Sequence, residues 1–444
     1  MIDSLLIANR GEIARRIIRT AKRLGIRTVA VYSEADAGMP FVVEADEAIC
    51  VGPANPAQSY RNTEAILAAA KSTGVQAVHP GYGFLSENAD FARAVATNGL
   101  IWVGPSAEAI TAMGDKINAR NLMADAGVPV APGTHDPAAT VEAAVEAANT
   151  IGYPVMVKAA AGGGGMGMAV AADEAALRVE YDKVHSFAER MFGDGSVLIE
   201  RYFPRVRHVE VQILGLADGR VIALSERECS VQRRNQKLVE EAPSPAVSPE
   251  LRERFLAAAV RAGEAVNYRN AGTVECLLDP ATGEFFFLEM NTRLQVEHPI
   301  TELIHGIDLV EQQLRIASGE PITFSVDAPT SGHAIELRVN AEDPKRFLPG
   351  PGKITTWSEP SGDGVRVDSG FAADTTVTPF YDSLMAKLIV YGTDRQDAIA
   401  KARAAVADFQ IAGPKNNLPF FAELLDNAEF VGGDYDTGIV ARMR

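Results

Sequence analysis

The sequence predicts a multidomain protein of mixed α/β and α+β class, composed of three segments that differ in pattern. Its 444 residues suffice for two or three domains with a large core. Residues 1–113 alternate short apolar runs with amphipathic stretches, which predicts an open parallel sheet. Residues 114–330 bring longer helices, hairpins and glycine-rich loops, and residues 331–444 begin with an alternating strand and end in helices. We therefore expect domains at 1–113, 114–330 and 331–444.

The first segment alternates strand and helix. The buried run SLLIAN predicts the first strand, and residues 12–24 place apolar side chains at helical spacing before Gly25. Residues 28–33 predict a second strand and residues 62–71 a further helix, followed by the strands AVHPG and LIWVG. The first turn, ANRGEIA, lacks the GxGxxG spacing, so a dinucleotide site is poorly supported.

Composition excludes several classes of function. The chain has 47% hydrophobic and 23% charged residues, as ordinary globular proteins do. A net charge of −16 argues against nucleic acid or an anionic membrane as the main partner. We expect no membrane span and no signal peptide. Because Cys50, Cys229 and Cys276 are scattered, we expect no disulfide framework and a cytoplasmic location.

The segment 272–298 carries the densest set of polar groups. Glu275 and Glu289 lie on the two arms of a predicted hairpin with an aromatic FFF run between them. Four further polar side chains follow at strict alternation: Asn291, Arg293, Gln295 and Glu297. On an extended strand, residues two apart share a face. Carboxylate and amide oxygens suit a hard divalent cation. We predict a magnesium or manganese site beside an oxyanion site with its own base.

A second candidate site is the glycine-rich loop after Lys158, which includes Gly163 and Gly164 in a run of four glycines. Successive glycines let backbone N–H groups turn toward an anion, and the lysine adds charge. The loop is not a P-loop, because no Gly-Lys-Ser/Thr follows. It lies in a compact stretch, 131–203, that is typical of a hinged lid over phosphates. The alternative is a plain flexible loop.

Two alternating strands also carry polar faces. His208 alternates with Glu210 and Gln212, which indicates a lined cleft more than a core. Arg338 alternates with Glu336, and here a solvated strand face is an equally good interpretation.

Several single residues remain open between a functional and a structural role. The stretch 227–237 gathers four basic side chains, either as a cationic wall for phosphates and an oxyanion or as a solvated loop. Lys116 opens a helix, and Glu200 could contact a nucleotide at a hinge or could simply be solvated. Tyr82 lies in a polar, structured turn, and Asp382 could cap a helix.

Taken together, these stretches resemble the biotin carboxylases, the ATP-grasp subunits of biotin-dependent carboxylases. The resemblance covers essentially the whole chain and implies an N-terminal α/β domain, an ATP-grasp core with a mobile lid and a C-terminal α+β domain. The matching motifs, in chain order, are IANRGEIA (7–14), HPGYGFLSEN (79–88), MGDK (113–116), KAxxGGGGxGM (158–168), RHVEVQ (207–212), the RRNQK loop, EMNTRLQVEH (289–298), RVNAEDP (338–344) and YDS…KL (381–388).

The resemblance also implies roles for individual residues. The ATP ligands would be Lys116, Lys158, Gly163, Gly164, Glu200, His208, Gln232 and Asn235. The metal ligands would be Glu275, Glu289 and Asn291. Bicarbonate would be held by Lys237, Arg293, Gln295 and the Val296 backbone N–H, with Glu297 as its base. Biotin would be held by Tyr82, Arg338 and Asp382, and the catalytic set would be Glu297, Arg338, Arg293 and Lys237.

The implied activity is ATP- and magnesium-dependent carboxylation of biotin by bicarbonate through carboxyphosphate. Biotin would arrive on a separate biotin carboxyl carrier protein, since no Ala/Val-Met-Lys-Met tetrapeptide appears and MAKL around Lys387 is only a partial match. The resemblance further implies a separate carboxyltransferase and a homodimer. Biotin is thus a carrier-bound substrate, and ATP with Mg²⁺ completes the reaction.

Two positions depart from the pattern of acyl-CoA carboxylases. Residue 166 is Met where Lys or Arg is usual, and residue 235 is Asn where many members have His. Both are similar to the urea-carboxylase branch, so the final carboxyl acceptor stays open. If the lack of a cation at Met166 weakens ATP binding, Met166→Lys should tighten it. The remaining alternatives are another ATP-grasp ligase, which would not need Arg338, and a regulatory nucleotide-binding subunit, which would have lost Glu297.

Overall fold

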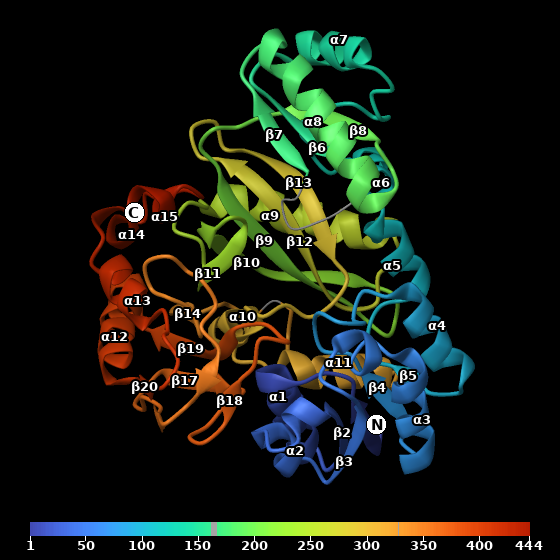
Figure 1. Cartoon of the computed structure of the whole chain (residues 1–444), viewed down its shortest axis with the longest axis vertical. Coiled ribbons are helices and arrows are strands. Elements are labelled where there is room, and N and C mark those ends of the chain that lie inside the picture. The colour runs from blue at the N-terminus through green and yellow to red at the C-terminus, as the bar shows by residue number, and fades with distance from the viewer. Residues whose placement is uncertain (161–166, 327) are drawn as a thin grey trace.

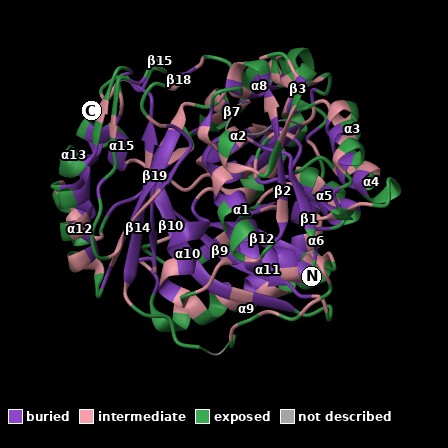
Figure 2. Ribbon diagram, turned by 90° about the horizontal axis from the view of Figure 1, so that it is seen from below, coloured by how far each residue is buried: buried purple, intermediate pink, exposed green. Residues whose placement is uncertain are grey.

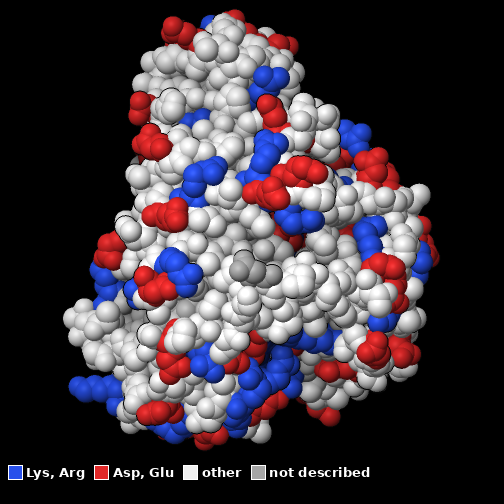
Figure 3. Space-filling view, turned by 180° about the vertical axis from the view of Figure 1, so that it is seen from behind, with Lys and Arg blue, Asp and Glu red and all other residues white. Residues whose placement is uncertain are grey.

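This computed structural model describes residues 1–160, 167–326 and 328–444. A small lobe carrying α7 (Val141–Ile151) and α8 (Glu174–Phe192) projects from one end of the molecule (Figure 1). At the other end the N-terminal sheet and the last third of the chain lie beside each other, below the long strands of the middle segment. Acidic and basic side chains are intermixed over the face seen in Figure 3.

The N-terminal sheet has five parallel strands in the order β3-β2-β1-β4-β5, as expected for this segment. Its strands are β1 (Ser4–Ile7), β2 (Arg27–Ser33), β3 (Glu47–Gly52), β4 (Ala77–His79) and β5 (Ile101–Trp102). The sequence did not predict β3, because most of this edge strand is exposed or half-buried and it lacks a long apolar run.

Helices cover both faces of this sheet. The predicted helix at 12–24 is α1, and its side chains at helical spacing, from Ile13 to Ala21, are buried. The predicted helix at 62–71 is α3; Asn62 accepts a hydrogen bond from the Ala65 N–H at its start. The helical elements here are α1 (Gly11–Arg23), η1 (Glu34–Asp36), α2 (Pro40–Glu44), η2 (Pro56–Gln58), α3 (Thr63–Thr73), α4 (Ala89–Thr97), α5 (Ala107–Gly114) and α6 (Lys116–Asp125).

The projecting lobe is built on a separate antiparallel sheet in the order β7-β6-β8. Its elements are α7 (Val141–Ile151), β6 (Val155–Ala159), β7 (Met168–Ala171), α8 (Glu174–Phe192) and β8 (Val197–Arg201). The two helices pack on the sheet around a core of their own that includes Val157, Leu177 and Ile199. These elements fall inside the stretch 131–203, whose role as a lid stays a prediction.

One antiparallel sheet of eight strands joins the rest of the chain, in the order β13-β12-β9-β10-β11-β14-β19-β17. Its strands are β9 (Arg207–Gly215), β10 (Val221–Arg233), β11 (Gln236–Ala242), β12 (Asn270–Asp279), β13 (Glu284–Asn291), β14 (His333–Asn340), β17 (Val365–Ser369) and β19 (Leu384–Gly392). Because β11 pairs directly with β14, main-chain hydrogen bonds tie the predicted second and third segments together.

The remaining elements surround this sheet. Figure 2 shows β9, β10, β14 and β19 buried, while the outer faces of α12 (Arg395–Asp408) and α13 (Leu418–Leu425) are exposed. The elements that surround the eight-stranded sheet are α9 (Pro249–Ala265), α10 (His298–His305), α11 (Leu309–Ala317), β15 (Gly352–Lys353), β16 (Thr356–Ser358), β18 (Thr376–Val377), α12 (Arg395–Asp408), β20 (Gln410–Ala412), α13 (Leu418–Leu425), α14 (Ala428–Gly432) and α15 (Ile439–Arg442). Within the described ranges, no helix is long and apolar enough to cross a membrane.

The interpretation of Asp382 as a helix cap is wrong. No helix begins there; the Leu384 N–H donates to Asp382 Oδ1 over 2.8 Å and strand β19 begins at Leu384. The following residues, LMAKLIVYG, lie between two neighbouring strands and are nearly all buried, which fixes them as a central strand.

Candidate active site

The predicted hairpin forms, but the alternation after it does not continue as a strand. Glu275 on β12 lies opposite Glu289 on β13. Beyond Asn291 the chain bends, and α10 begins at His298 with Pro299 in its first turn. The expected extended face is therefore wrong past Asn291. The side chains converge because the bend folds them back over the sheet.

The Lys237 ammonium lies at the centre of these groups. Its Nζ donates to Glu210 Oε2 at 2.5 Å, to Glu297 Oε1 at 2.7 Å and to Glu275 Oε1 at 2.8 Å. Burial disfavours the charged lysine, but the three carboxylates outweigh it and raise the pKa of Lys237 well above its ordinary value. Lys237 is therefore a fixed cation shared by three acids.

Glu297 is buried between two cations. Its Oε2 lies 3.0 Å from Arg338 Nη2, and Lys237 contacts its other oxygen. Burial alone would favour the neutral acid, but Lys237 and then Arg338 hold the pKa of Glu297 below its usual range. The carboxylate is thus ionised and can accept a proton from a ligand that displaces one of its partners.

Arg338 is shared with a second carboxylate that the sequence patterns did not single out. Glu240 Oε1 lies 2.5 Å from Arg338 Nη2, and Glu240 faces Glu336 across the β11–β14 pair. Burial raises the pKa of Glu240 to about 7, and burial also raises the pKa of Glu336. Glu240 could have been identified by its position opposite Glu336, but this position is known only once β11 is paired with β14.

The donor set around Glu275 fits a hard divalent cation. Glu275 accepts hydrogen bonds from Asn291 Nδ2 at 2.9 Å and from Gln295 Nε2 at 2.7 Å. Limited hydration and then the charge of Glu275 raise the pKa of Glu289. Two facing carboxylates, Glu275 and Glu289, are a suitable pair for Mg²⁺ or Mn²⁺. Asn291 Oδ1 is held by Arg293 Nη2 at 2.6 Å, so this oxygen would join a metal only after Arg293 moves.

Arg293 links the hairpin to the N-terminal domain. Its Nε donates to Glu87 Oε2 at 3.2 Å, and the Thr292 N–H donates to Glu87 Oε1 at 3.0 Å. Glu87 belongs to the polar turn that also contains Tyr82, and Asn88 caps α4 from the same turn. The turn is thus structured, as the sequence predicts, and it places Arg293 at the edge of the site.

The predicted nucleotide ligands occupy the lobe and the adjoining strands. Lys158 on β6 forms an ion pair with Glu200 on β8, across the lobe's sheet. Lys116 is half-buried at the start of α6, where burial lowers its pKa. His208 Nε2 lies 2.9 Å from Glu275 Oε2. Three residues named in the sequence analysis lie outside the described ranges: Gly163, Gly164 and Met166.

The basic stretch 227–237 is a strand and a turn, so the interpretation as a solvated loop is wrong. It forms the end of β10, a tight turn at Arg234 and Asn235 with positive φ angles of 49° and 65°, and the start of β11. Gln232 lies opposite Lys237 across this hairpin. Asn235 is exposed at the tip, away from the buried carboxylates.

The residues predicted for biotin are only partly brought together. The Tyr82 hydroxyl donates to Glu12 on α1, and burial and then the charge of Glu12 raise the pKa of Tyr82 well above its ordinary value. Asp382 is exposed and lines a separate cavity of about 430 Å³ together with Arg233 and other residues. Tyr82 is thus held by Glu12, and Asp382 lines a cavity that neither Tyr82 nor Arg338 lines.

Lys387, from the MAKL segment, is a structural residue. Its side chain is fully buried, and its Nζ lies 3.1 Å from Glu12 Oε2 and donates to the Val296 carbonyl at 2.9 Å. It therefore holds the backbone of the turn that the resemblance assigns to bicarbonate, and it also anchors the partner of Tyr82. A fully buried lysine is not an attachment site for biotin.

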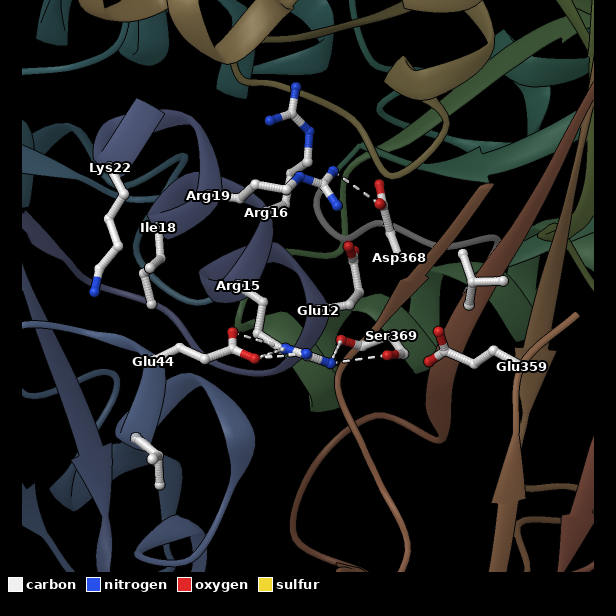
Figure 4. A pocket seen from close by; sticks show the side chains of 12 residues that line it. Glu12, Arg15, Arg16, Ile18, Arg19, Lys22, Glu44, Glu359, Asp368 and Ser369 are labelled. Atoms are coloured by element: carbon white, nitrogen blue, oxygen red, sulfur yellow. Dashed lines mark hydrogen bonds and ion pairs between the residues drawn. The ribbon is translucent and has the colours of Figure 1, made fainter. Parts of the chain in front are cut away.

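A cavity of about 580 Å³ lies between α1 and β17, and Glu12, the acceptor of Tyr82, is among the residues that line it. Figure 4 shows Arg15 bridging Glu44 and Ser369 there, and Arg19 reaching Asp368. It contains none of the residues predicted for catalysis, so we place the active site at Lys237 and Glu297.

Comparison with known proteins agrees with this architecture. Residues 1–110 match the family model "Biotin carboxylase, N-terminal domain", residues 115–324 match "Carbamoyl-phosphate synthase L chain, ATP binding domain", and residues 336–442 match "Biotin carboxylase C-terminal domain". The chain is 51% identical over 438 residues to biotin carboxylase 2 of Bacillus subtilis, covering 98% of each chain. It is 49% identical to a pyruvate carboxylase subunit from Methanothermobacter thermautotrophicus, covering 100% of this chain and 90% of that one.

Solved structures give the same result. The biotin carboxylase of Campylobacter jejuni, crystallised as a β,γ-ATP complex, superposes with a TM-score of 0.96 at 45% identity, covering 100% of this chain and 99% of that one. The biotin carboxylase domain dimer of the 2-oxoglutarate carboxylase of Hydrogenobacter thermophilus, solved with MgADP, ADP and bicarbonate, gives 0.95 at 43% identity, covering 100% and 98%. The fold and the site define a multidomain protein with an ATP-grasp core. The chain belongs to the biotin carboxylase family.

Proposed function

We propose that this chain carboxylates carrier-bound biotin, with bicarbonate as the carbon source and ATP as the energy source. The observation that carries the proposal is the buried Glu297 carboxylate between Lys237 and Arg338. An ionised base beside two cations is suited to deprotonate an oxyanion and to hold the resulting charge. Another ATP-grasp ligase has no evident use for this combination.

In the first step, Glu297 takes the proton of bicarbonate, and the bicarbonate oxygen attacks the γ-phosphorus of ATP. The bond to the β-phosphate oxygen breaks, which gives ADP and carboxyphosphate. Lys237, Arg293 and the Gln295 amide would hold the anion in place, with positioning and electrostatics supplying most of the rate. When bound by Glu275 and Glu289, Mg²⁺ would offset charge on the nucleotide phosphates.

In the second step, carboxyphosphate separates into CO₂ and phosphate, and phosphate removes the N1 proton of biotin. Arg338 would stabilise the negative charge that this leaves on the ureido oxygen, while N1 attacks CO₂. Arg338 is already fixed by Glu240 and Glu297, so it needs little rearrangement. The lobe over the nucleotide, with Lys158 and Glu200, would exclude water from a hydrolysable intermediate.

We also propose the domain boundaries 1–113, 114–330 with a lid at 131–203, and 331–444. The three family matches support this division. A homodimer with separate carrier and carboxyltransferase subunits is supported by the dimer named for the Hydrogenobacter domain and by the naming of the Methanothermobacter relative as one subunit of its enzyme. Scattered free cysteines support a cytoplasmic location. The relatives' names include different acceptors, so the acceptor of this chain stays open.

The test is ADP formation from ATP and Mg²⁺, measured with and without bicarbonate and with and without free biotin. The proposal expects a biotin-stimulated rate that disappears when bicarbonate is omitted. If the rate is slow and does not depend on free biotin, the same assay is repeated with biotinylated carrier proteins. If those also leave the rate unchanged, the proposal is wrong.

A further inference from the structure

Arg227 lies directly behind the site and has no assigned role. It is on β10, and its side chain is completely buried. Every guanidinium N–H has an acceptor of its own: Glu210 Oε1 at 2.6 Å, Gln295 Oε1 at 2.7 Å, Gln212 Oε1 at 2.8 Å, Thr301 Oγ1 at 3.0 Å and Thr273 Oγ1 at 3.1 Å. A five-donor fork with five partners is held in one orientation.

The contact with Gln295 decides which way that amide faces. Arg227 can only donate, so it selects the oxygen end of the amide. The NH₂ end is then directed to the opposite side, where it donates to Glu275 Oε1 at 2.7 Å. A bicarbonate oxygen next to Glu275 would meet a donor, whereas a flipped amide would present an acceptor and repel it.

The contact with Glu210 acts on a second site residue. Glu210 Oε1 accepts from Arg227, and its Oε2 accepts from Lys237 Nζ at 2.5 Å. The carboxylate is therefore fixed between two cations, and it holds the same lysine that Glu297 contacts. Arg227 thus acts on the amide directly and on the ammonium through Glu210.

We propose that Arg227 is a positioning residue for bicarbonate, which fixes the Gln295 amide directly and the Lys237 ammonium through Glu210. The inference rests on the proposed function, since it gives Gln295 and Lys237 their task. The competing interpretation is a buried ion pair that only stabilises the fold, and such a pair would affect all substrates alike.

Arg207 provides a matched control. It is also buried on the neighbouring strand β9, it pairs with Glu228 at 3.1 Å, and it donates to the Gly433 carbonyl at 3.0 Å. None of these partners is among the predicted site residues. Arg207→Lys therefore removes the same kind of buried fork at a distance from bicarbonate.

The experiment measures KM for bicarbonate, KM for ATP, bicarbonate-independent ATP hydrolysis and Tm for Arg227→Lys and Arg207→Lys. A lysine keeps one contact with Glu210 but cannot reach five acceptors. For Arg227→Lys we expect KM for bicarbonate to rise about tenfold or more, as for loss of a charge-assisted hydrogen bond, with KM for ATP within about twofold. Arg207→Lys should lower Tm, but it should not raise KM for bicarbonate more than it raises KM for ATP.

A double mutant tests whether Arg227 acts on bicarbonate through the Gln295 amide. In a Gln295→Ala background the amide is absent, so Arg227→Lys should raise KM for bicarbonate by clearly less than it does in the parent chain. Full additivity, or equal changes in the two KM values, would overturn the inference. If Arg227→Lys does not fold, Thr301→Val loosens the same guanidinium by one contact and should raise KM for bicarbonate selectively; an unchanged value overturns the inference in that case.

The proposed function and the role of Arg227 fail separately. An unmodified chain without bicarbonate-dependent ADP release contradicts the proposed function itself. An active chain whose Arg227 variants leave bicarbonate KM unchanged contradicts only the role of Arg227.

Discussion

Lys237 Nζ lies 2.7 Å from Glu297 Oε1, so the predicted base and a predicted bicarbonate ligand form one ion pair. The same ammonium lies 2.8 Å from Glu275, a predicted metal ligand. One buried cation therefore links the predicted base to the predicted metal site. The arrangement preorganises the charges that the reaction needs.

Glu297→Gln should abolish bicarbonate-dependent ADP release while ATP binding stays nearly intact. The amide keeps the size of the carboxylate but cannot accept the proton of bicarbonate, and loss of a general base costs about 100- to 10,000-fold. The rate of ADP release and the Kd for ATP, measured on one preparation, test this. Unchanged turnover would show that Glu297 is not the base.

Glu240 should make stability depend on pH. Burial raises its pKa from the ordinary 4.5 to about 7, so the folded chain binds the proton more tightly than the unfolded one. The associated stability is present below pH 4.5 and is lost as pH rises through 7. Glu240→Gln does not titrate, so its free energy of unfolding relative to the parent chain should rise by about 2.5 kcal/mol from pH 5 to pH 8.

Asp46→Asn is the control for this pH dependence. Although burial opposes it, hydrogen bonds from Thr28 lower the pKa of Asp46 to about 2, so its contribution is already complete at pH 5. The difference in Tm between Asp46→Asn and the parent should be the same at pH 5 and pH 8. A constant difference for Glu240→Gln as well would contradict the raised pKa of Glu240.

Glu289→Gln should weaken the use of magnesium. One of the two facing carboxylates becomes neutral, and the concentration of Mg²⁺ that gives half-maximal rate should rise at least about tenfold. Glu284→Gln, on the exposed end of the same hairpin arm, should leave it unchanged. Titration of the ADP-forming rate with Mg²⁺ at fixed ATP distinguishes them, and equal curves for all three chains would contradict the metal assignment.

Lys387→Met should destabilise the fold by about 3–5 kcal/mol, because Glu12 is left as a buried charge without its partner. Glu12→Gln in the same chain should restore part of this loss. Urea unfolding of the single and double variants provides the free energies of unfolding. A double variant no more stable than Lys387→Met would show that the Lys387–Glu12 pair is not the source of the effect.

Local patterns predicted much of the fold. The parallel sheet, α1, α3 and the β12–β13 hairpin follow from apolar periodicity and caps within about twenty residues. Strand β3 was missed because an edge strand with few buried side chains carries little periodic signal. The direct pairing of β11 with β14 could not be predicted, since their register joins residues about a hundred positions apart.

The sequence predicted the residues of the site to a similar extent as the fold. Lys237, Glu275 and Glu297 do converge, as predicted. Glu297, however, reaches the site because the chain bends after Asn291, and the predicted extended strand does not continue there. Arg227 and Glu240 were missed as individual residues. In the sequence they are ordinary members of charged runs, and only burial and cross-strand neighbours distinguish them.

The most direct measurement is the transfer of isotopically labelled bicarbonate to biotin in the presence of ATP and Mg²⁺. We predict labelled carboxybiotin with the unmodified chain, and none with Glu297→Gln. If ADP is released without any label reaching free or carrier-bound biotin, then the chain activates bicarbonate for a different acceptor or not at all, and its assignment as a biotin-carboxylating enzyme is contradicted.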